Sequence, residues 1–166
     1  MSKRSTVTVR ARPVAGKTSV SGPLTVRAET FAIDTTDRFQ LFDLTDRLRT
    51  LVAAAGIAEG TVNLFSTHTT CTVFINEHQR ALLADIRTFL EQTVPQEAAW
   101  LHNDPAHSDC DRGNADAHLR AILLGHSLTL QVSDGDVVLG QWQRVLMAEL
   151  DGPRTRTLRV SIMGVA

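Results

Sequence analysis

Three histidines lie where predicted secondary-structure elements begin or end. His68 lies between two β-rich runs, His102 lies in a polar loop, and His118 lies in the first turn of a predicted helix. Neutral imidazoles from several segments, with carboxylates nearby, are ligands for a divalent metal such as Zn, Ni or Co. The same rings could instead carry protons, because histidine titrates near neutral pH. The sequence leaves both chemistries open.

Two asparagines, each followed closely by an acid, start predicted helices. Asn76-Glu77 follows an apolar strand, and Asn114 precedes Asp116 and His118. Capping asparagines and acids near a helix N-terminus explain both pairs structurally. In the functional interpretation, Glu77 is a base or accepts a hydrogen bond from a substrate hydroxyl or amine. Free amides at Asn114 could hold a phosphate, but Asp116 disfavours direct contact with an anion.

Arg154 and Arg156 follow the predicted turn at residues 151–153. A guanidinium binds phosphate or carboxylate with two parallel hydrogen bonds. Residues two apart in a strand face the same side, so these arginines are candidates for one anion site. By the same geometry His68 and Cys71 face opposite sides of a strand, which argues against a Cys–His nucleophile pair. Trp142 is interpreted as a core or interface residue.

The elements that must position these residues form a mixed α and β pattern. Strands are predicted at 24–33, 39–42, 61–66 and 70–75, and helices from about 44 to Gly56, from Asn76 to Pro95 and from Asn114 to Gly125. The last part, with strands at 127–132, 137–139, 145–150 and 157–163, is predicted to be a meander with Asp-Gly turns. The polar segment 96–113 is long enough to suggest a functional loop. This order favours an α+β fold.

Composition narrows the class of protein. The chain has 166 residues, the size of one domain, with 43% apolar and 21% charged residues, as is usual for soluble proteins. Seventeen basic and eighteen acidic side chains give a net charge of -1, so neither nucleic acid nor a membrane is expected as partner. Two cysteines form no disulfide framework, which predicts reduced thiols and a cytoplasmic protein. The basic residues 1–22 are predicted to be a flexible extension, preceding a domain at 23–166.

Several motifs together resemble the YjbQ-like family, an uncharacterised protein family. They are His68-Thr69-Thr70-Cys71, Asn76-Glu77, Asp85, His102, Asn114-Ala115-Asp116-Ala117-His118-Leu119, Gly140-Gln141-Trp142-Gln143 and Glu149-Leu150-Asp151-Gly152-Pro153-Arg154. The resemblance covers about residues 24–165, in order. Members usually carry a small residue such as Ala where Cys71 stands, which further lowers the case for a catalytic thiol.

The resemblance implies a fold and a reaction. The fold is one α+β domain with a mixed, strongly folded sheet and about three helices, assembling as a homotrimer. The activity is a secondary thiamine-phosphate synthase, which joins hydroxymethylpyrimidine diphosphate to a thiazole phosphate and releases diphosphate. Two alternatives remain open: a metal-dependent hydrolase of unknown substrate, and a non-catalytic trimer that binds a metal or ligand.

The resemblance and the residue chemistry together assign roles. The catalytic candidates are His68, Glu77, Asp116 and His118. The candidates for substrate or phosphate binding are Thr69, Thr70, Asn76, Asn114, Asp151, Arg154 and Arg156. The candidate metal ligands are His68, His102 and His118, for Zn, Ni, Co or Mg. The expected partner is a phosphorylated small molecule.

Overall fold

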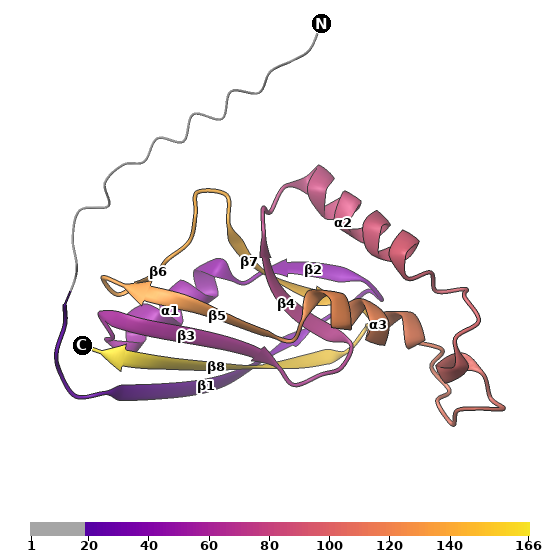
Figure 1. The fold of residues 1–166 in the computed structure, drawn as a ribbon, viewed down its shortest axis with the longest axis horizontal. Coiled ribbons are helices and arrows are strands. Elements are labelled where there is room, and N and C mark those ends of the chain that lie inside the picture. The colour runs from indigo at the N-terminus through magenta and orange to yellow at the C-terminus, as the bar shows by residue number, and fades with distance from the viewer. Residues whose placement is uncertain (1–18) are drawn as a thin grey trace, which may run out of the picture.

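The computed structural model describes residues 19–166, whose strands form two sheets (Figure 1). In spatial order, the first sheet contains β1 (Thr25–Asp34), β8 (Thr155–Val165), β3 (Glu59–Ser66), β5 (Ser127–Ser133) and β6 (Asp136–Val137). The second contains β2 (Gln40–Asp43), β7 (Arg144–Glu149) and β4 (Cys71–Asn76). Of the predicted extension at 1–22, residues 1–18 lie outside the described residues, so its flexibility stays a prediction.

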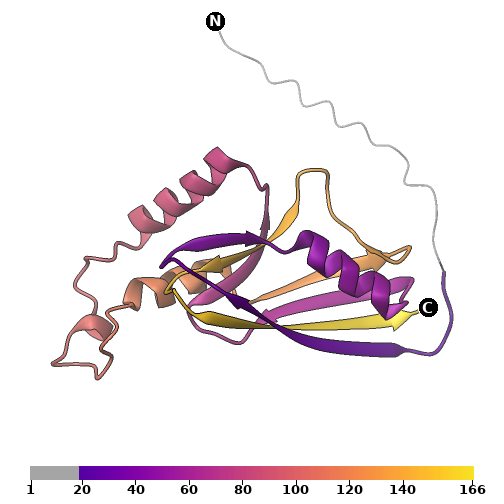
Figure 2. The ribbon, with the colours of Figure 1, turned by 180° about the vertical axis from the view of Figure 1, so that it is seen from behind.

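The helix α1 (Thr45–Ala55) covers one face of the first sheet. It lies behind this sheet in Figure 1 and in front of it in Figure 2. Leu48 and Val52 of α1 are buried in the same apolar cluster as Val62 of β3 and Val160 of β8. The helix ends at Gly56, as predicted, where φ of 66° is a left-handed conformation that glycine adopts without strain.

The helices α2 (Arg80–Thr93) and α3 (Ala115–Leu124) pack on the second sheet, and a 3-10 helix, η1 (Leu101–Asn103), lies between them in sequence. A second apolar cluster joins Leu90 of α2, Ala117 and Ala121 of α3, and Ala148 and Leu150 at the end of β7. Small alanines let α3 approach the sheet closely. The start of α3 is therefore fixed beside the turn between β7 and β8.

The predicted α+β fold with three helices is confirmed, but two details were wrong. Every strand pairing among residues 19–166 is antiparallel, so the sheets are not mixed. The last strands form no continuous meander either. The predicted hairpin of β5 and β6 at Asp134-Gly135 is present, but β7 lies between β2 and β4, and β8 lies between β1 and β3. The reason is burial: residues 145–150 are all buried, so β7 needs neighbours at both edges.

The predicted asparagine caps also need correction. Asn76 ends β4, and α2 begins later, with the Gln79 side chain accepting from the N–H of Leu82 at 2.8 Å. Asn114 occupies the N-cap position of α3 but makes no capping hydrogen bond. Asn103 takes that role, since its Oδ1 accepts from the N–H of Ala115 at 2.9 Å.

Among residues 19–166, no helix has both the length and the apolar character needed to cross a bilayer.

Candidate functional site

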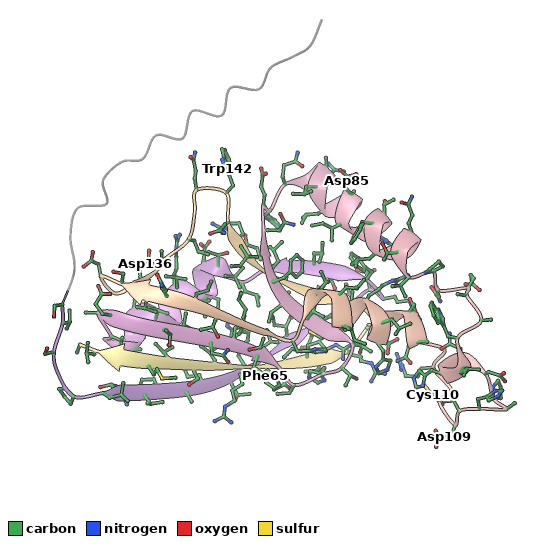
Figure 3. All side chains as sticks on the ribbon, in the orientation of Figure 1. Phe65, Asp85, Asp109, Cys110, Asp136 and Trp142 are labelled. Carbon is green, nitrogen blue, oxygen red and sulfur yellow. The ribbon has the colours of Figure 1, made fainter. Side chains whose placement is uncertain are left out.

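A polar pocket of about 340 Å³ opens where three segments meet: the connection between β3 and β4, the start of α3, and the segment from the turn between β7 and β8 to the first residues of β8. Figure 3 shows the neighbouring loop, with Asp109 and Cys110 labelled beyond α3. The pocket collects most of the side chains predicted to bind substrate. Its lining residues are Thr67, His68, Thr69, Thr70, Asn114, His118, Asp151, Arg154 and Arg156.

Arg156, which lines this polar pocket, forms a buried ion pair with Glu149. The Nε of Arg156 donates to Glu149 Oε2 at 2.6 Å, and its Nη2 donates to the other carboxylate oxygen and to Thr70 Oγ1. Thr35 donates a further hydrogen bond to Glu149 Oε2 at 3.0 Å. Because Glu149 neutralises Arg156, this arginine adds donors to the pocket but no excess charge. Its predicted contact with phosphate stays a prediction.

Asp151 is the centre of a second, larger charge network. It is 1% exposed, and its Oδ2 accepts hydrogen bonds from Asn114 at 2.9 Å, from Arg112 at 3.0 Å and from Arg154 at 3.3 Å. Arg38 approaches Oδ1 to 3.9 Å. Burial alone would raise the pKa of Asp151, but the hydrogen bonds from Asn114 and Arg112 and the nearby guanidinium charges outweigh it and lower the pKa. Asp151 is therefore ionised at neutral pH.

The three arginines around Asp151 keep part of their surface in water. The exposed fractions of their side chains are 38% for Arg38, 43% for Arg112 and 37% for Arg154. Across the linked ion pairs of the described residues, four guanidinium groups face two carboxylates, an excess of two positive charges. The guanidinium groups belong to Arg38, Arg112, Arg120 and Arg154, and the carboxylates to Asp116 and Asp151. The network favours an anion.

His68 is fixed by the backbone. The N–H of Thr157 donates to its Nε2 at 2.7 Å, so the neutral ring carries its proton on Nδ1. Burial lowers the pKa of His68, and the charge of Arg156 lowers it further. At neutral pH this side chain therefore offers an N–H donor at the polar pocket.

His118 faces His102, with ring centres 5.1 Å apart and ring planes at 85°. Burial lowers the pKa of His118, and the neighbouring His102 lowers it further. His118 is thus neutral near pH 7 and can accept a proton. Two imidazoles on one tetrahedral zinc would place their ring centres roughly 5 Å apart, which matches the spacing of this pair.

The predicted three-histidine metal site is not assembled in one described chain. The lone pair of His68 Nε2 is occupied by the Thr157 N–H. Among residues 19–166, no three His, Cys, Asp or Glu side chains come together in a group that could hold a metal ion. Of the three predicted ligands, residues 19–166 bring together only the pair His102 and His118, and a metal at this pair stays a prediction.

Asp116 lies behind the polar pocket rather than in it. It is fully buried, with Oδ2 2.8 Å from Arg120 and Oδ1 3.1 Å from Arg38. Arg120 in turn donates to the carbonyl of Val94 at 2.8 Å. This geometry fits a positioning role for Asp116, which orients Arg38 toward Asp151. Its predicted catalytic role stays a prediction.

Glu77 and Asn76 lie at the far end of β4. Glu77 belongs to a different pocket, also of about 340 Å³, which we name the Trp142 pocket. Its lining residues are Asp43, Glu77, His78, Gln79, Gln141, Trp142 and Arg144. A strand of this length separates Thr70 from Glu77 by roughly 20 Å. Within one chain, Glu77 therefore does not reach His118 or Arg154.

Sequence reasoning missed Arg38 and Arg112. Arg38 lies between β1 and β2, and no local pattern connects it with a turn more than a hundred residues later. Gly152 makes the contact possible: its N–H donates to the Arg38 carbonyl at 3.1 Å, and a side chain there would collide with the Asp37 carbonyl. Arg112 does lie in the long polar loop that was predicted to be functional.

Cys71 is buried, and burial raises the pKa of its thiol to about 11. The thiol is therefore protonated at neutral pH, and protonated thiols are weak nucleophiles.

Fold and pocket together define a small α+β domain with a polar pocket lined in part by arginines. The family model described as "UPF0047 protein YjbQ-like" matches residues 29–165, and the chain belongs to this family. A UPF0047 protein of Methanothermobacter thermautotrophicus is 43% identical over 139 residues, which are 84% of this chain and 93% of that protein. The UPF0047 protein YugU of Bacillus subtilis is 31% identical over 82% of this chain and 98% of its own length.

Solved structures agree with the fold. A YbjQ-like protein of unknown function from Sulfolobus solfataricus P2 superimposes with a TM-score of 0.80 at 34% identity, covering 86% of this chain and 99% of that one. A YjbQ/UPF0047 family protein from Clostridium acetobutylicum gives a TM-score of 0.73 at 29% identity, covering 81% and 98%.

Proposed function

We propose that this protein is a transferase that joins hydroxymethylpyrimidine diphosphate to a thiazole phosphate and releases diphosphate. One observation carries the phosphate-handling part of the proposal: Asp151, which lines the polar pocket, is buried and ionised and gathers three partly exposed arginines, of which Arg154 also lines the pocket. The family resemblance supplies the particular reaction.

The reaction needs charge stabilisation more than proton transfer. The thiazole attacks the benzylic-type carbon, the bond from that carbon to the diphosphate oxygen breaks, and the electron pair leaves with the diphosphate. Negative charge therefore builds up on the leaving group, where positioned guanidinium groups have their largest effect. Arg154 and Arg112 are suited to hold the diphosphate, and the Nδ1–H of His68 adds a neutral donor.

His118 is suited to contact the reacting part of the substrate. Its ring is neutral near pH 7 and lines the polar pocket beside Arg154. It can therefore accept a hydrogen bond from the pyrimidine amine. Where a divalent metal takes part, His102 and His118 would hold it, and the ion would supply further charge neutralisation for the diphosphate.

The test measures diphosphate release from the two precursors and, separately, the binding of inorganic diphosphate. We expect Arg154→Gln to weaken diphosphate binding about 10- to 100-fold, since a hydrogen bond to a charged group contributes roughly 1.5–3 kcal/mol. Arg159→Gln, at an exposed position of β8, the strand that Arg154 immediately precedes, is the matched control and should bind like the parent.

His118→Gln should lower turnover more than diphosphate affinity, because His118 acts on the reacting group. Normal turnover in both Arg154→Gln and His118→Gln would overturn the proposal. Diphosphate release in the absence of the thiazole phosphate would identify a hydrolase instead.

A further inference from the structure

A second pocket, which we name the apolar pocket, lies next to the polar pocket. It has a volume of about 340 Å³, within the range of small-molecule sites. Its lining residues are Trp100, Leu101, His102, Ala115, His118 and Leu119. No arginine, lysine or carboxylate contributes to this lining, in contrast to the polar pocket.

His118 lines both pockets, so the two adjoin at this side chain. A ligand lying across His118 would therefore have its charged end among arginines and its other end among apolar and aromatic groups. We infer that the apolar pocket is a subsite for the planar ring of a phosphate-bearing substrate, with His118 beside the bond between ring and phosphate. This inference rests on the proposed function, because it takes the polar pocket to be the phosphate site.

The lining favours a flat ring over a flexible chain. The Nε1 of Trp100 donates to the carbonyl of Pro95 at 2.8 Å, which fixes the indole in place. A fixed aromatic face loses little entropy when a second ring packs against it, and such pairs contribute about 0.5–1.5 kcal/mol beyond buried area. Leu101 is 65% exposed, so a ring over it would remove apolar surface from water.

The substrate class follows from the order of the groups. The arginines select a phosphate or diphosphate, and the apolar pocket selects an aromatic ring. Because His118 lines both pockets, we place the ring and the phosphate on one ligand, joined directly or through a short linker. The predicted substrates are therefore aryl or arylmethyl phosphates and diphosphates.

Tryptophan fluorescence can report on this subsite directly. The chain has two tryptophans, Trp100 and Trp142, and Figure 3 shows Trp142 on the loop between β6 and β7, away from α3. In the Trp142→Phe variant only Trp100 emits. We expect phenyl phosphate to change the Trp100 emission and to bind about tenfold or more tightly than methyl phosphate at equal ionic strength. Inorganic phosphate should leave the emission nearly unchanged.

Two further variants separate this inference from the proposed function. In the same background, Leu101→Ser should reduce the preference for phenyl over methyl phosphate severalfold and leave methyl phosphate affinity unchanged. Ile122→Ser is the matched control, since Ile122 is an exposed apolar residue of α3 outside the apolar pocket. Arg154→Gln should weaken both phosphates equally.

The outcomes are distinguishable. If phenyl and methyl phosphate bind equally well, or if Leu101→Ser has no effect on their ratio, the ring subsite is wrong and the phosphate site stands. If neither binds, or Arg154→Gln changes nothing, the proposed function fails as well. If Leu101→Ser alters the oligomeric state and not the phenyl preference, the apolar pocket is a protein contact instead.

Discussion

Two groups of charged residues lie at opposite ends of the strand β4, and they differ in burial and in net charge. At its start, the carboxylates of Glu149 and Asp151 are at most 1% exposed, and arginines gather around them. At its end, in the Trp142 pocket, Asp43 and Arg144 form a pair with exposed fractions of 19% and 33%. Both ends contain arginine, acid, histidine and amide side chains. Only the first combines buried anions with an excess of partly exposed cations, which is what an anion site requires.

The largest difference should appear in stability. Glu149→Gln removes the charge that neutralises buried Arg156, and breaking a buried ion pair from one side typically costs 3–5 kcal/mol, so we expect a loss of about 3 kcal/mol or more. Asp43→Asn makes the same change at the Trp142 pocket, where the pair is partly solvated and the expected loss is about 1 kcal/mol or less. Urea unfolding of the two variants measures both values.

The double variant Glu149→Leu/Arg156→Met provides the check on this result. Replacing both charges by apolar groups removes the unpaired ion, so it should be more stable than Glu149→Gln. Equal losses for Glu149→Gln and Asp43→Asn would remove the energetic distinction between the two ends.

The next effect concerns the arginines that the sequence did not reveal. We expect Arg112→Gln to weaken inorganic diphosphate binding about tenfold, because one charge-assisted donor beside Asp151 is lost. Arg144→Gln, at the Trp142 pocket, should leave the affinity unchanged. Calorimetric titration at two salt concentrations tests this, because the arginine-dependent part should weaken with added salt. A larger loss in Arg144→Gln than in Arg112→Gln would place the anion site at the Trp142 pocket and contradict the assignment to the polar pocket.

A smaller effect should appear in the pH dependence of stability. His68 and His118 have pKa values below the usual 6.5, so the folded chain binds fewer protons than the unfolded chain in this range. Their contribution to the free energy of unfolding is present above about pH 6.5 and is lost as the pH falls through the folded-state pKa. The lowered pKa of Asp151 acts in the same direction, but only at more acidic pH.

The variant His68→Gln isolates the contribution of His68 to the pH dependence of stability. Its amide oxygen can still accept from the Thr157 N–H, and it cannot titrate, so the fall in stability between about pH 7 and pH 5 should become shallower. His78→Gln, at the Trp142 pocket, is the comparison variant outside the polar pocket. Denaturant unfolding at several pH values gives the comparison. An unchanged slope in His68→Gln would contradict the assignment.

The sequence predicted the parts of the fold that depend on local patterns. Helix α1 with its Gly56 end, the end of α2 before Pro95, and the polar loop before α3 all follow from periodicity and turn chemistry. The pairing of β7 and β8 with strands from the N-terminal half could not be predicted from local patterns. Asp-Gly turns suggest that consecutive strands pair as hairpins, and only the long-range strand order shows that β7 and β8 do not.

The candidate site was predictable to the same degree. Residues near the ends of adjacent elements, such as His68, His118 and Arg154, do meet in one pocket. The motifs alone could not show that Glu77 lies at the opposite end of β4 from the polar pocket. Glu77 is only seven residues from Thr70 in the sequence, but those residues form an extended strand that carries the two side chains apart. Arg38 and the Thr157 N–H contact their partners across more than 80 residues, through strand pairings that no local pattern specifies.

The smallest expected effect is that of Glu77→Gln on diphosphate affinity. Glu77 lies roughly 20 Å along β4 from the polar pocket, too far for a direct contact within one chain. We expect the affinity to change less than about twofold, because a partly solvated charge at this distance is screened. Arg154→Gln serves as the comparison variant in the same titration. A large loss in Glu77→Gln would mean that a second copy brings its Trp142 pocket against this polar pocket, as the predicted homotrimer allows.

In that case, mixed assemblies of Glu77→Gln and His118→Gln subunits should regain the activity that each variant lacks alone, and light scattering would give their stoichiometry.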